Sequence, residues 1–258
     1  MGTGPREWDG TTYDRVAAPM TRMGSAVLDR LPLRGDEVVL DAGCGSGQVT
    51  AKLAARLPRG HVIALDASAS MLDVARTTLA PYASQVAYVQ ADLSLALPAM
   101  PPLDAVLSTA TFHWVAGHRG LFERLGARMK AGARLVAQWG GSGNVSRVTD
   151  ALAAVGHDFD GIAGWPGPWW FPTAEAVSDQ LTAAGFHIEE CWLHREDVHL
   201  EGRGALEDYL ATPILVAHLA RLAPADRPRL VSAIADRIPD GHVDYVRVNV
   251  VARLGNLS

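Results

Sequence analysis

The residues best suited to chemistry form a stretch in which one acidic residue precedes three glycines at alternate positions. It runs from Val38 to Gln48 and reads Val-Val-Leu-Asp-Ala-Gly-Cys-Gly-Ser-Gly-Gln, so that Asp41 is followed by Gly43, Gly45 and Gly47. Because glycine has no Cβ, such a chain can turn sharply and approach a ligand closely. A helix that begins directly afterwards would add free N–H groups at its positive end. We therefore predict that the stretch is a cofactor loop.

The spacing of the glycines excludes two common phosphate-binding loops. A dinucleotide fingerprint needs Gly-x-Gly-x-x-Gly, but the third position is Gln48 or Thr50, depending on the register. A P-loop ends in Gly-Lys-Ser/Thr, and this loop contains no lysine. A loop with an acid ahead of its glycines suits instead a ligand that is positively charged at this end. The alternative is an ordinary strand, turn and helix whose glycines serve only the backbone.

Two further aspartates occupy equivalent places. Asp66 ends a predicted strand over residues 61–65, and Asp92 follows another over residues 86–90. A single aspartate at the end of a strand usually caps a helix or shapes a turn. In an open α/β sheet, however, ligands bind outside the carboxyl ends of the strands, so Asp41, Asp66 and Asp92 should converge on one crevice.

The elements that hold these residues alternate between strands and helices, which predicts βαβ crossovers and an α/β fold with a doubly wound, mostly parallel sheet. The predicted strands span residues 38–40, 61–65, 86–90, 105–107 and 134–139, and the predicted helices span 48–57, 70–79 and 121–129. Ser70 and Asp73 have the spacing of a capping box in the second of these helices. An amphipathic helix, or a kinked pair interrupted at Pro19, is predicted over residues 13–30.

The last third of the chain departs from this alternation. Helices are predicted over residues 145–155 and 173–184, long strands over 186–199 and 243–254, and a helical insert broken by prolines over 205–237. The two long strands should form an antiparallel hairpin at the edge of the sheet, which then has seven strands. Residues 161–172, rich in Trp, Pro and Gly, should form an apolar lid; simple core packing is the alternative.

Composition limits the class of protein. The 258 residues are 48% hydrophobic and predict one domain over 1–258, with an N-terminal helical cap (1–35), a cofactor-binding core (36–140), and a lid, helical insert and closing strands (141–258). A net charge of −5 argues against a large nucleic-acid surface. Two cysteines without metal-ligand spacing predict no metal site and a reduced, cytoplasmic location. Because no apolar run reaches 18 residues, membrane insertion is not expected.

The stretch from Asp41 to Gly47 resembles motif I, D/E-x-G-x-G-x-G, of the class I S-adenosylmethionine-dependent methyltransferases. The layout is also similar to the trans-aconitate methyltransferase-like branch of small-molecule methyltransferases, including Phe-His-Trp at residues 112–114 and Pro-Trp-Trp-Phe-Pro at residues 168–172. The resemblance covers nearly the whole chain, although its specific motifs lie mainly between residues 38 and 139. It implies a seven-stranded sheet and methyl transfer from S-adenosylmethionine.

The resemblance also implies which residues hold the cofactor. Asp66 would bind both ribose hydroxyls, Asp92 would bind the adenine amine, and Asp41 with the glycine loop would hold the methionine portion. Met71 would cover one face of the adenine, with core packing as its alternative. The expected cofactor-binding residues are Asp41, Gly43, Gly45, Gly47, Asp66, Ala67, Met71, Asp92, Leu93 and Thr109.

The acceptor is expected near the segment that follows the fourth strand. His113 or Tyr13 could act as a general base, since an imidazole titrates near neutral pH; a histidine hydrogen-bonded beneath the cofactor is the alternative. The expected substrate-binding residues are Trp8, Tyr13, His113, Trp114, Gln138, Trp139, Trp165, Trp169 and Trp170.

The predicted reaction is methyl transfer to an O or C atom of a small, apolar or aromatic metabolite. The Asn/Asp-Pro-Pro-Tyr motif of amino-methylating nucleic-acid enzymes is absent, and the uncharged lid argues against a tricarboxylate such as aconitate. A second reading stays open, in which bound S-adenosylmethionine acts as a fixed positive charge that steers a cyclisation. A nicotinamide-dependent dehydrogenase is disfavoured by the missing glycine. The chain should work as a monomer or a homodimer, without nucleic-acid or membrane partners.

Overall fold

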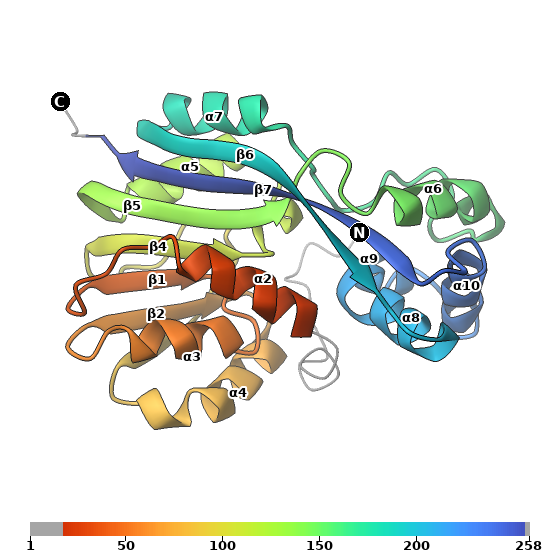
Figure 1. Ribbon diagram of the computed structural model, residues 1–258, viewed down its shortest axis with the longest axis horizontal. Coiled ribbons are helices and arrows are strands. Elements are labelled where there is room, and N and C mark those ends of the chain that lie inside the picture. Colours follow the sequence, from red (N-terminus) through yellow and green to blue (C-terminus); the bar gives the residue numbers. More distant parts are fainter. Residues whose placement is uncertain (1–17, 256–258) are drawn as a thin grey trace.

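The computed structural model describes residues 18–255, which form a layered α/β body with a helical extension at one end (Figure 1). Within these residues the sheet has seven strands in the order β3-β2-β1-β4-β5-β7-β6, and β7 is antiparallel to both β5 and β6. The strands are β1 (Val38–Ala42), β2 (His61–Asp66), β3 (Val86–Gln90), β4 (Leu103–Thr109), β5 (Met129–Gly140), β6 (Phe186–His199) and β7 (His242–Leu254). The predicted mostly parallel sheet with an antiparallel C-terminal hairpin is confirmed.

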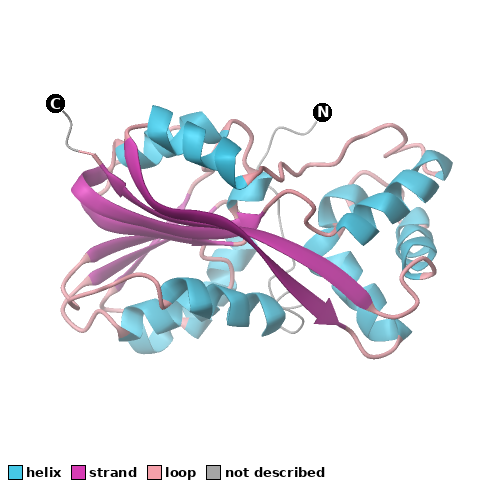
Figure 2. Cartoon of the chain, turned by 45° about the horizontal axis from the view of Figure 1, so that its top comes forward, coloured by secondary structure: helices cyan, strands magenta, loops and turns pink. Residues whose placement is uncertain are grey.

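Helices cover both faces of this sheet (Figure 2). Leu28, Leu53 and Leu72 pack beneath one face, whereas Leu121 and Leu181 belong to a separate core on the other. These residues come from α2 (Ala18–Leu28), α3 (Gln48–Ala55), α4 (Ala69–Thr78), α5 (His118–Gly126) and α7 (Ala174–Ala183). Burial on both faces explains why the parallel strands are continuous apolar runs rather than alternating ones.

The two C-terminal strands are longer than the parallel ones and extend into a second, helical body (Figures 1 and 2). Its helices are α6 (Ser146–Val155), α8 (Arg203–Tyr209), α9 (Val216–Leu219) and α10 (Asp226–Ala235), with a π-helical turn over Leu210–Ile214. They bury their own core, which includes Val148, Leu210 and Ile234. The predicted helical insert between the last two strands is therefore confirmed, and Pro213 lies inside its π-helical turn.

One predicted helix cap and one predicted helix start were wrong. Helix α4 begins one residue earlier than expected, because extended Ser68 is its N-cap and accepts a hydrogen bond from the Met71 N–H (3.3 Å); the proposed capping box at Ser70 and Asp73 is not the cap. Helix α5 covers residues 118–126 rather than 121–129, since Met129 already pairs with Leu103 in the sheet. No helix within residues 18–255 is long and apolar enough to cross a membrane.

A hydrogen-bonded cap fixes the start of α7, directly after the aromatic segment. The Thr173 hydroxyl accepts a hydrogen bond from the Ala176 N–H (3.2 Å). We predict that Thr173→Ala lowers the free energy of unfolding by about 1 kcal/mol, the typical value of such a cap. Thr182→Ala, a matched change at an exposed position late in the same helix, should be neutral or slightly stabilising, because alanine is the better helix former. Urea denaturation of both variants tests this, and equal losses would contradict the assigned cap.

Candidate active site

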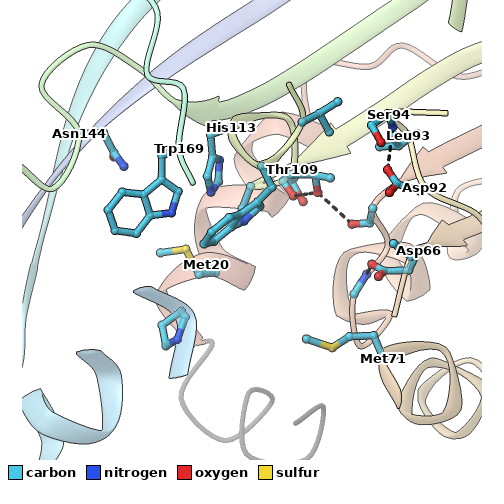
Figure 3. Close-up of a pocket in the computed structure, with 18 of the residues that line it drawn as sticks. Met20, Asp66, Met71, Asp92, Leu93, Ser94, Thr109, His113, Asn144 and Trp169 are labelled. Carbon is cyan, nitrogen blue, oxygen red and sulfur yellow. Dashed lines mark hydrogen bonds between the residues drawn. The ribbon is translucent and has the colours of Figure 1, made fainter. Parts of the chain in front are cut away.

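A cavity of about 360 Å³ opens at the carboxyl ends of the parallel strands, where the sheet meets the helical body. Figure 3 shows that it has two sides. Asp66, Met71 and Asp92 lie on one side, and His113 and Trp169 lie on the other. The acidic residues at the ends of β2 and β3 therefore share one crevice, as the strand order predicted.

The glycine loop forms the floor of the acidic side, and each of its three glycines is required for a different structural reason. A Cβ on Gly43 would lie 2.2 Å from the Thr111 hydroxyl oxygen, so the loop can pass this close only without a side chain. Gly45 also needs its positive φ of 53°, but a Cβ there would meet no atom within 4 Å, and Gly45 lines the cavity. Gly47 does not line the cavity; it starts α3 at φ 85° and lies against Leu79.

Backbone amides hold the two carboxylates that line the cavity in place. The Gly45 N–H donates to Asp66 Oδ2, and the Ser68 N–H donates to Asp66 Oδ1, both at 2.9 Å. The Ser94 N–H donates to Asp92 Oδ1 at 2.8 Å (Figure 3). Each carboxylate oxygen can accept more than one hydrogen bond, so both groups keep acceptor capacity toward a ligand.

Asp41 behaves differently from the other two acids. It is 1% exposed and is not among the cavity-lining residues; its carboxylate accepts a hydrogen bond from the Thr50 hydroxyl at 2.7 Å. Burial raises the pKa of Asp41 to about 7, the Thr50 hydrogen bond opposes this rise, and the nearby Asp66 charge adds to it. The expectation that all three carboxylates face one crevice is thus wrong for Asp41, which supports the loop from within the protein.

Aromatic side chains build the other side of the cavity. Trp169 stacks on Phe171 with ring centroids 5.6 Å apart and planes at 17°, and the Trp114 ring lies 5.9 Å from Trp169. Among residues 18–255, Ala110 and Val145 are the non-glycine residues with positive φ, and both line this cavity. Backbone strain of this kind costs about 1–3 kcal/mol and concentrates at ligand sites.

Comparison with known proteins decides the family. A family model described as a methyltransferase domain matches residues 39–132. The trans-aconitate 2-methyltransferase of Methylobacterium nodulans is 32% identical over 188 residues, which are 72% of this chain and 67% of that protein. The chain belongs to the class I S-adenosylmethionine-dependent methyltransferases. The trans-aconitate 2-methyltransferase of Azoarcus sp. aligns with 88% of this chain and 87% of its own length at 29% identity, which places the chain in the trans-aconitate methyltransferase-like branch.

Solved structures resemble this methyltransferase in fold. A putative methyltransferase from Bacillus halodurans has a TM-score of 0.64 at 18% identity, over 90% of this chain and 99% of its own. The cyclase SpnF has a TM-score of 0.62 at 20% identity, over 98% of this chain and 88% of its own. At such identities the likeness concerns the fold and carries no information on the reaction.

The His113 ring lines the methyltransferase cavity, but its hydrogen bond does not favour the predicted role of general base. The Gly140 N–H donates to His113 Nδ1 at 3.3 Å. In the neutral ring this leaves the proton on Nε2, so that Nε2 would donate a hydrogen bond rather than accept a proton. The other predicted base, Tyr13, lies outside the described residues, as does Trp8.

Two residues expected to bind substrate lie in the interior of the methyltransferase instead. Gln138 does not line the cavity, and its Nε2 donates to Asn249 Oδ1 at 2.9 Å. Trp139 is 1% exposed and packs on Phe112, with ring centroids 5.2 Å apart. Both predictions were wrong because β5 continues beside β7, whose cross-strand neighbours and covering helices bury the end of the strand.

The aromatic segment contributes one tryptophan to the cavity rather than three. Trp169 lines it, whereas Trp165 and Trp170 do not. The Trp170 ring lies edge-on to His118, 4.1 Å between centroids, and the Trp165 ring lies under the Arg221 guanidinium at 4.4 Å. Trp169 is therefore the tryptophan of this segment that could contact an acceptor, and its role in a lid stays a prediction, whereas Trp165 and Trp170 pack against other side chains.

Several cavity residues were not predicted from the sequence. They come from α2, from the turn before α6, from the π-helical turn and from β7, and they include Met20, Asn144, Ile214, Tyr245 and Arg247. Polar residues alternate with valines in β7. This pattern shows that the strand has two chemically different faces, but it does not show which face is buried by other parts of the protein. Tyr245 and Arg247 are 4% and 2% exposed. The sequence did contain one signal for Arg247. It is a charged residue in the middle of a strand that the predicted hairpin places beside other strands, where a charged side chain is unusual unless it has a partner.

The raised pKa of Asp41 generates a prediction on stability. A carboxyl whose pKa is higher in the folded than in the unfolded protein destabilises the fold once the unfolded chain ionises first. For Asp41 this window runs from the ordinary value of 3.8 to about 7. Without cofactor, Asp41→Asn should therefore gain stability over the wild type as the pH rises through this window, by an amount of the order of 4 kcal/mol or less, and no further above pH 7.

Urea denaturation between pH 4 and pH 8.5 measures this difference. Asp104→Asn is the matched control, because burial of Asp104 would raise its pKa but hydrogen bonds from Lys130 and the Val38 N–H outweigh it and lower the pKa. Asp104→Asn should lose stability by a constant amount above pH 5, since both folded and unfolded Asp104 are then ionised. A constant difference for Asp41→Asn as well would contradict the raised pKa.

The open space above Gly45 generates a second prediction. Gly45→Val would place a side chain in the cavity rather than against protein atoms, so it should abolish S-adenosylmethionine binding measured by calorimetry. Gly132→Val is the matched control, because Gly132 also has a positive φ (75°) with no atom within 4 Å of a Cβ, but it does not line the cavity. Both changes should cost stability through the strained φ, and only Gly45→Val should lose the cofactor. Equal cofactor affinities would show that the loop has a structural role only.

Proposed function

We propose that this methyltransferase transfers the methyl group of S-adenosylmethionine to an O or C atom of a small metabolite with an apolar or aromatic body. The observation that carries the proposal is one continuous cavity with two chemically different sides. One side offers carboxylates and a glycine floor, and the other offers stacked aromatic rings. A cofactor and an acceptor of matching chemistry can therefore meet in the same cavity.

The acidic side fits the cofactor in charge and in shape. A Cβ on Gly45 would project into the cavity, and the carboxylates of Asp66 and Asp92, which also line it, are hydrogen-bond acceptors of the kind that suit a ribose diol and an exocyclic amine. The carboxylates also favour the positive sulfonium. We assign Asp66 to the ribose, Asp92 to the adenine amine, and Asp41 to support of the loop. The remaining proposed contacts are Gly43, Gly45, Ala67, Met71, Leu93 and Thr109.

The aromatic side would align the acceptor. The chemistry that the cofactor supplies is an electrophilic methyl group, so the protein mainly has to position the nucleophile in line with it and exclude water. Trp114, Trp169 and Phe171 supply the apolar walls for this. His113 lines the same cavity, and we assign it to positioning the acceptor.

A tricarboxylate acceptor is not favoured, although relatives bear the name trans-aconitate 2-methyltransferase. Among the described residues that line the cavity, Arg247 is the one lysine or arginine side chain. Three carboxylates in a largely apolar cavity would need more compensation than one cation. The similarity to a cyclase is one of fold alone, so methyl transfer is the proposal that the family supports. The cytoplasmic location, the partners and the division of the chain at residues 35 and 140 stay predictions.

Formation of S-adenosylhomocysteine tests the proposed function directly. The purified protein should bind S-adenosylmethionine in a calorimeter, and with a methyl-labelled cofactor and a panel of small aromatic and aliphatic acceptors it should release S-adenosylhomocysteine and label one acceptor. Acceptor conversion without S-adenosylhomocysteine would replace the proposal with the cyclisation reading. A labelled tricarboxylate in place of an apolar acceptor would overturn the assigned acceptor class.

The different places of two neighbouring tryptophans generate a selective prediction. Trp169→Ala should raise KM or lower kcat for the acceptor at least tenfold, about 1.4 kcal/mol, while S-adenosylmethionine affinity changes less than threefold. Trp170→Ala removes a ring that packs on His118 outside the cavity, so it should lower Tm with little selective effect on the acceptor. Steady-state kinetics and thermal melts of the pair measure both. If Trp170→Ala impaired turnover of the acceptor and Trp169→Ala only lowered Tm, the acceptor site would instead lie near Trp170.

A further inference from the structure

Arg247 is a buried cation that lines the cavity from β7. Its side chain is 2% exposed, and its guanidinium carbon lies 4.4 Å from the centroid of the Tyr245 ring. Nη2 donates to the thioether sulfur of Met20 at 2.9 Å and lies 3.6 Å from that of Met23. Nε is buried and has no hydrogen-bond partner among residues 18–255. Sulfur is a weak acceptor, so most of the donor capacity of this guanidinium is unused.

No carboxylate among the described residues forms an ion pair with Arg247. The acid nearest in sequence, Asp244, is engaged elsewhere, since its carboxylate accepts hydrogen bonds from the Ser146 hydroxyl and from the Arg147 N–H at 3.1 Å. Other arginines of the structure show the contrast: Arg253, on the same strand, pairs with Glu189, and Arg147 pairs with Asp240. Arg247 is thus charged, buried and without a counter-ion from residues 18–255.

Such an arrangement is costly for the protein alone. A buried charge without a partner is strongly destabilising, and contact with an aromatic ring offsets only part of this effect. A neutral side chain of similar length would fill the same space more cheaply. The planar guanidinium is, in contrast, the group best shaped to bind a carboxylate through two parallel hydrogen bonds. The position of Arg247 therefore suits a ligand that brings one negative charge.

We propose that Arg247 binds a single carboxylate of the acceptor, whose apolar body then packs against Trp169 and Phe171. This inference rests on the proposed function and narrows it to a monocarboxylate with an apolar or aromatic body. The bound carboxylate is an anchor rather than the methylated group, because pairing with a guanidinium withdraws negative charge from its oxygens and lowers their nucleophilicity. Another O or C atom of the same molecule forms the new bond to the methyl group as the methyl–sulfur bond of S-adenosylmethionine breaks. The proton that this atom carried is released to solvent, so S-adenosylhomocysteine is left and the product keeps its negative charge.

Binding of matched pairs of small molecules tests the proposal. The probes are phenylacetate, cinnamate and 4-hydroxybenzoate, each beside its primary amide, with phenyl phosphate and trans-aconitate for comparison. They are titrated calorimetrically into the protein saturated with S-adenosylhomocysteine. At least one acid should bind tenfold or more tightly than its amide and more tightly than phenyl phosphate or trans-aconitate. Equal affinities within every pair, no binding by any acid, or preference for the phosphate or the tricarboxylate would overturn the proposal.

Variants assign the preference to one side chain. Arg247→Met should remove the preference for the acid over its amide and leave S-adenosylmethionine affinity within threefold of the wild type. Arg247→Lys should keep part of the preference, since lysine retains the positive charge but cannot form two parallel hydrogen bonds to a carboxylate. Arg253→Met, the same change at an exposed position on the same strand, should keep all of it. A preference that survives Arg247→Met would overturn the assignment.

Thermal stability separates this role from a structural one. Removal of an uncompensated buried charge should leave Tm unchanged or raise it in Arg247→Met, whereas a structural arginine would lower it. The wild type should also gain Tm with the preferred acid, and Arg247→Met should not. The proposed function has a different test: it is wrong if S-adenosylmethionine does not bind or if no acceptor yields S-adenosylhomocysteine. The present inference fails when cofactor binding is intact but acids and amides bind alike.

Discussion

The structure depends on how closely the loop after β1 passes the neighbouring strands. Gly43 lies against Thr111 so tightly that a Cβ would sit 2.2 Å from the hydroxyl oxygen. The N–H groups of Gly43 and Cys44 both donate to the Leu65 carbonyl, at 2.8 and 2.9 Å, and the next glycine donates to the Asp66 carboxylate. The ends of β1, β2 and β4 are thereby joined at one point. The strand ends and the loop between β1 and α3 therefore form the floor of the cavity together, through these contacts and hydrogen bonds.

The opposite wall has a different origin. It comes from residues that are distant in sequence, which the long strand β7 and the aromatic segment carry to the cavity: Trp169, Phe171, Tyr245 and Arg247. A wall assembled in this way can change its side chains without disturbing the glycine floor. The two halves of the site therefore place different demands on the chain, which is consistent with one cofactor serving many acceptors across a family.

This difference also explains what could be predicted from the sequence. The glycine loop, the acids after β2 and β3, and the sheet class follow from local patterns, because residue type and position relative to a strand end decide them. Trp139 and Arg247 do not follow in this way, since a two-residue period shows that a strand has two faces but not whether each is covered by helix, ligand or solvent. Asp41 shows the same limit at closer range. Its place at the strand end was right, but its side chain bonds to Thr50 rather than facing the crevice.

The charged residues of the cavity would orient bound ligands. Asp66 and Asp92 line the acidic side, whereas the buried guanidinium of Arg247 contacts Met20, which Figure 3 shows near Trp169 on the other side. In a poorly solvated space, opposite charges at two ends orient ligands more strongly than they would in water. A cationic cofactor and an anionic acceptor would each be repelled from the other's place and attracted to its own. The apolar rings would then have no need to recognise a specific functional group, because they would only hold the body of the acceptor between two ends already fixed by charge.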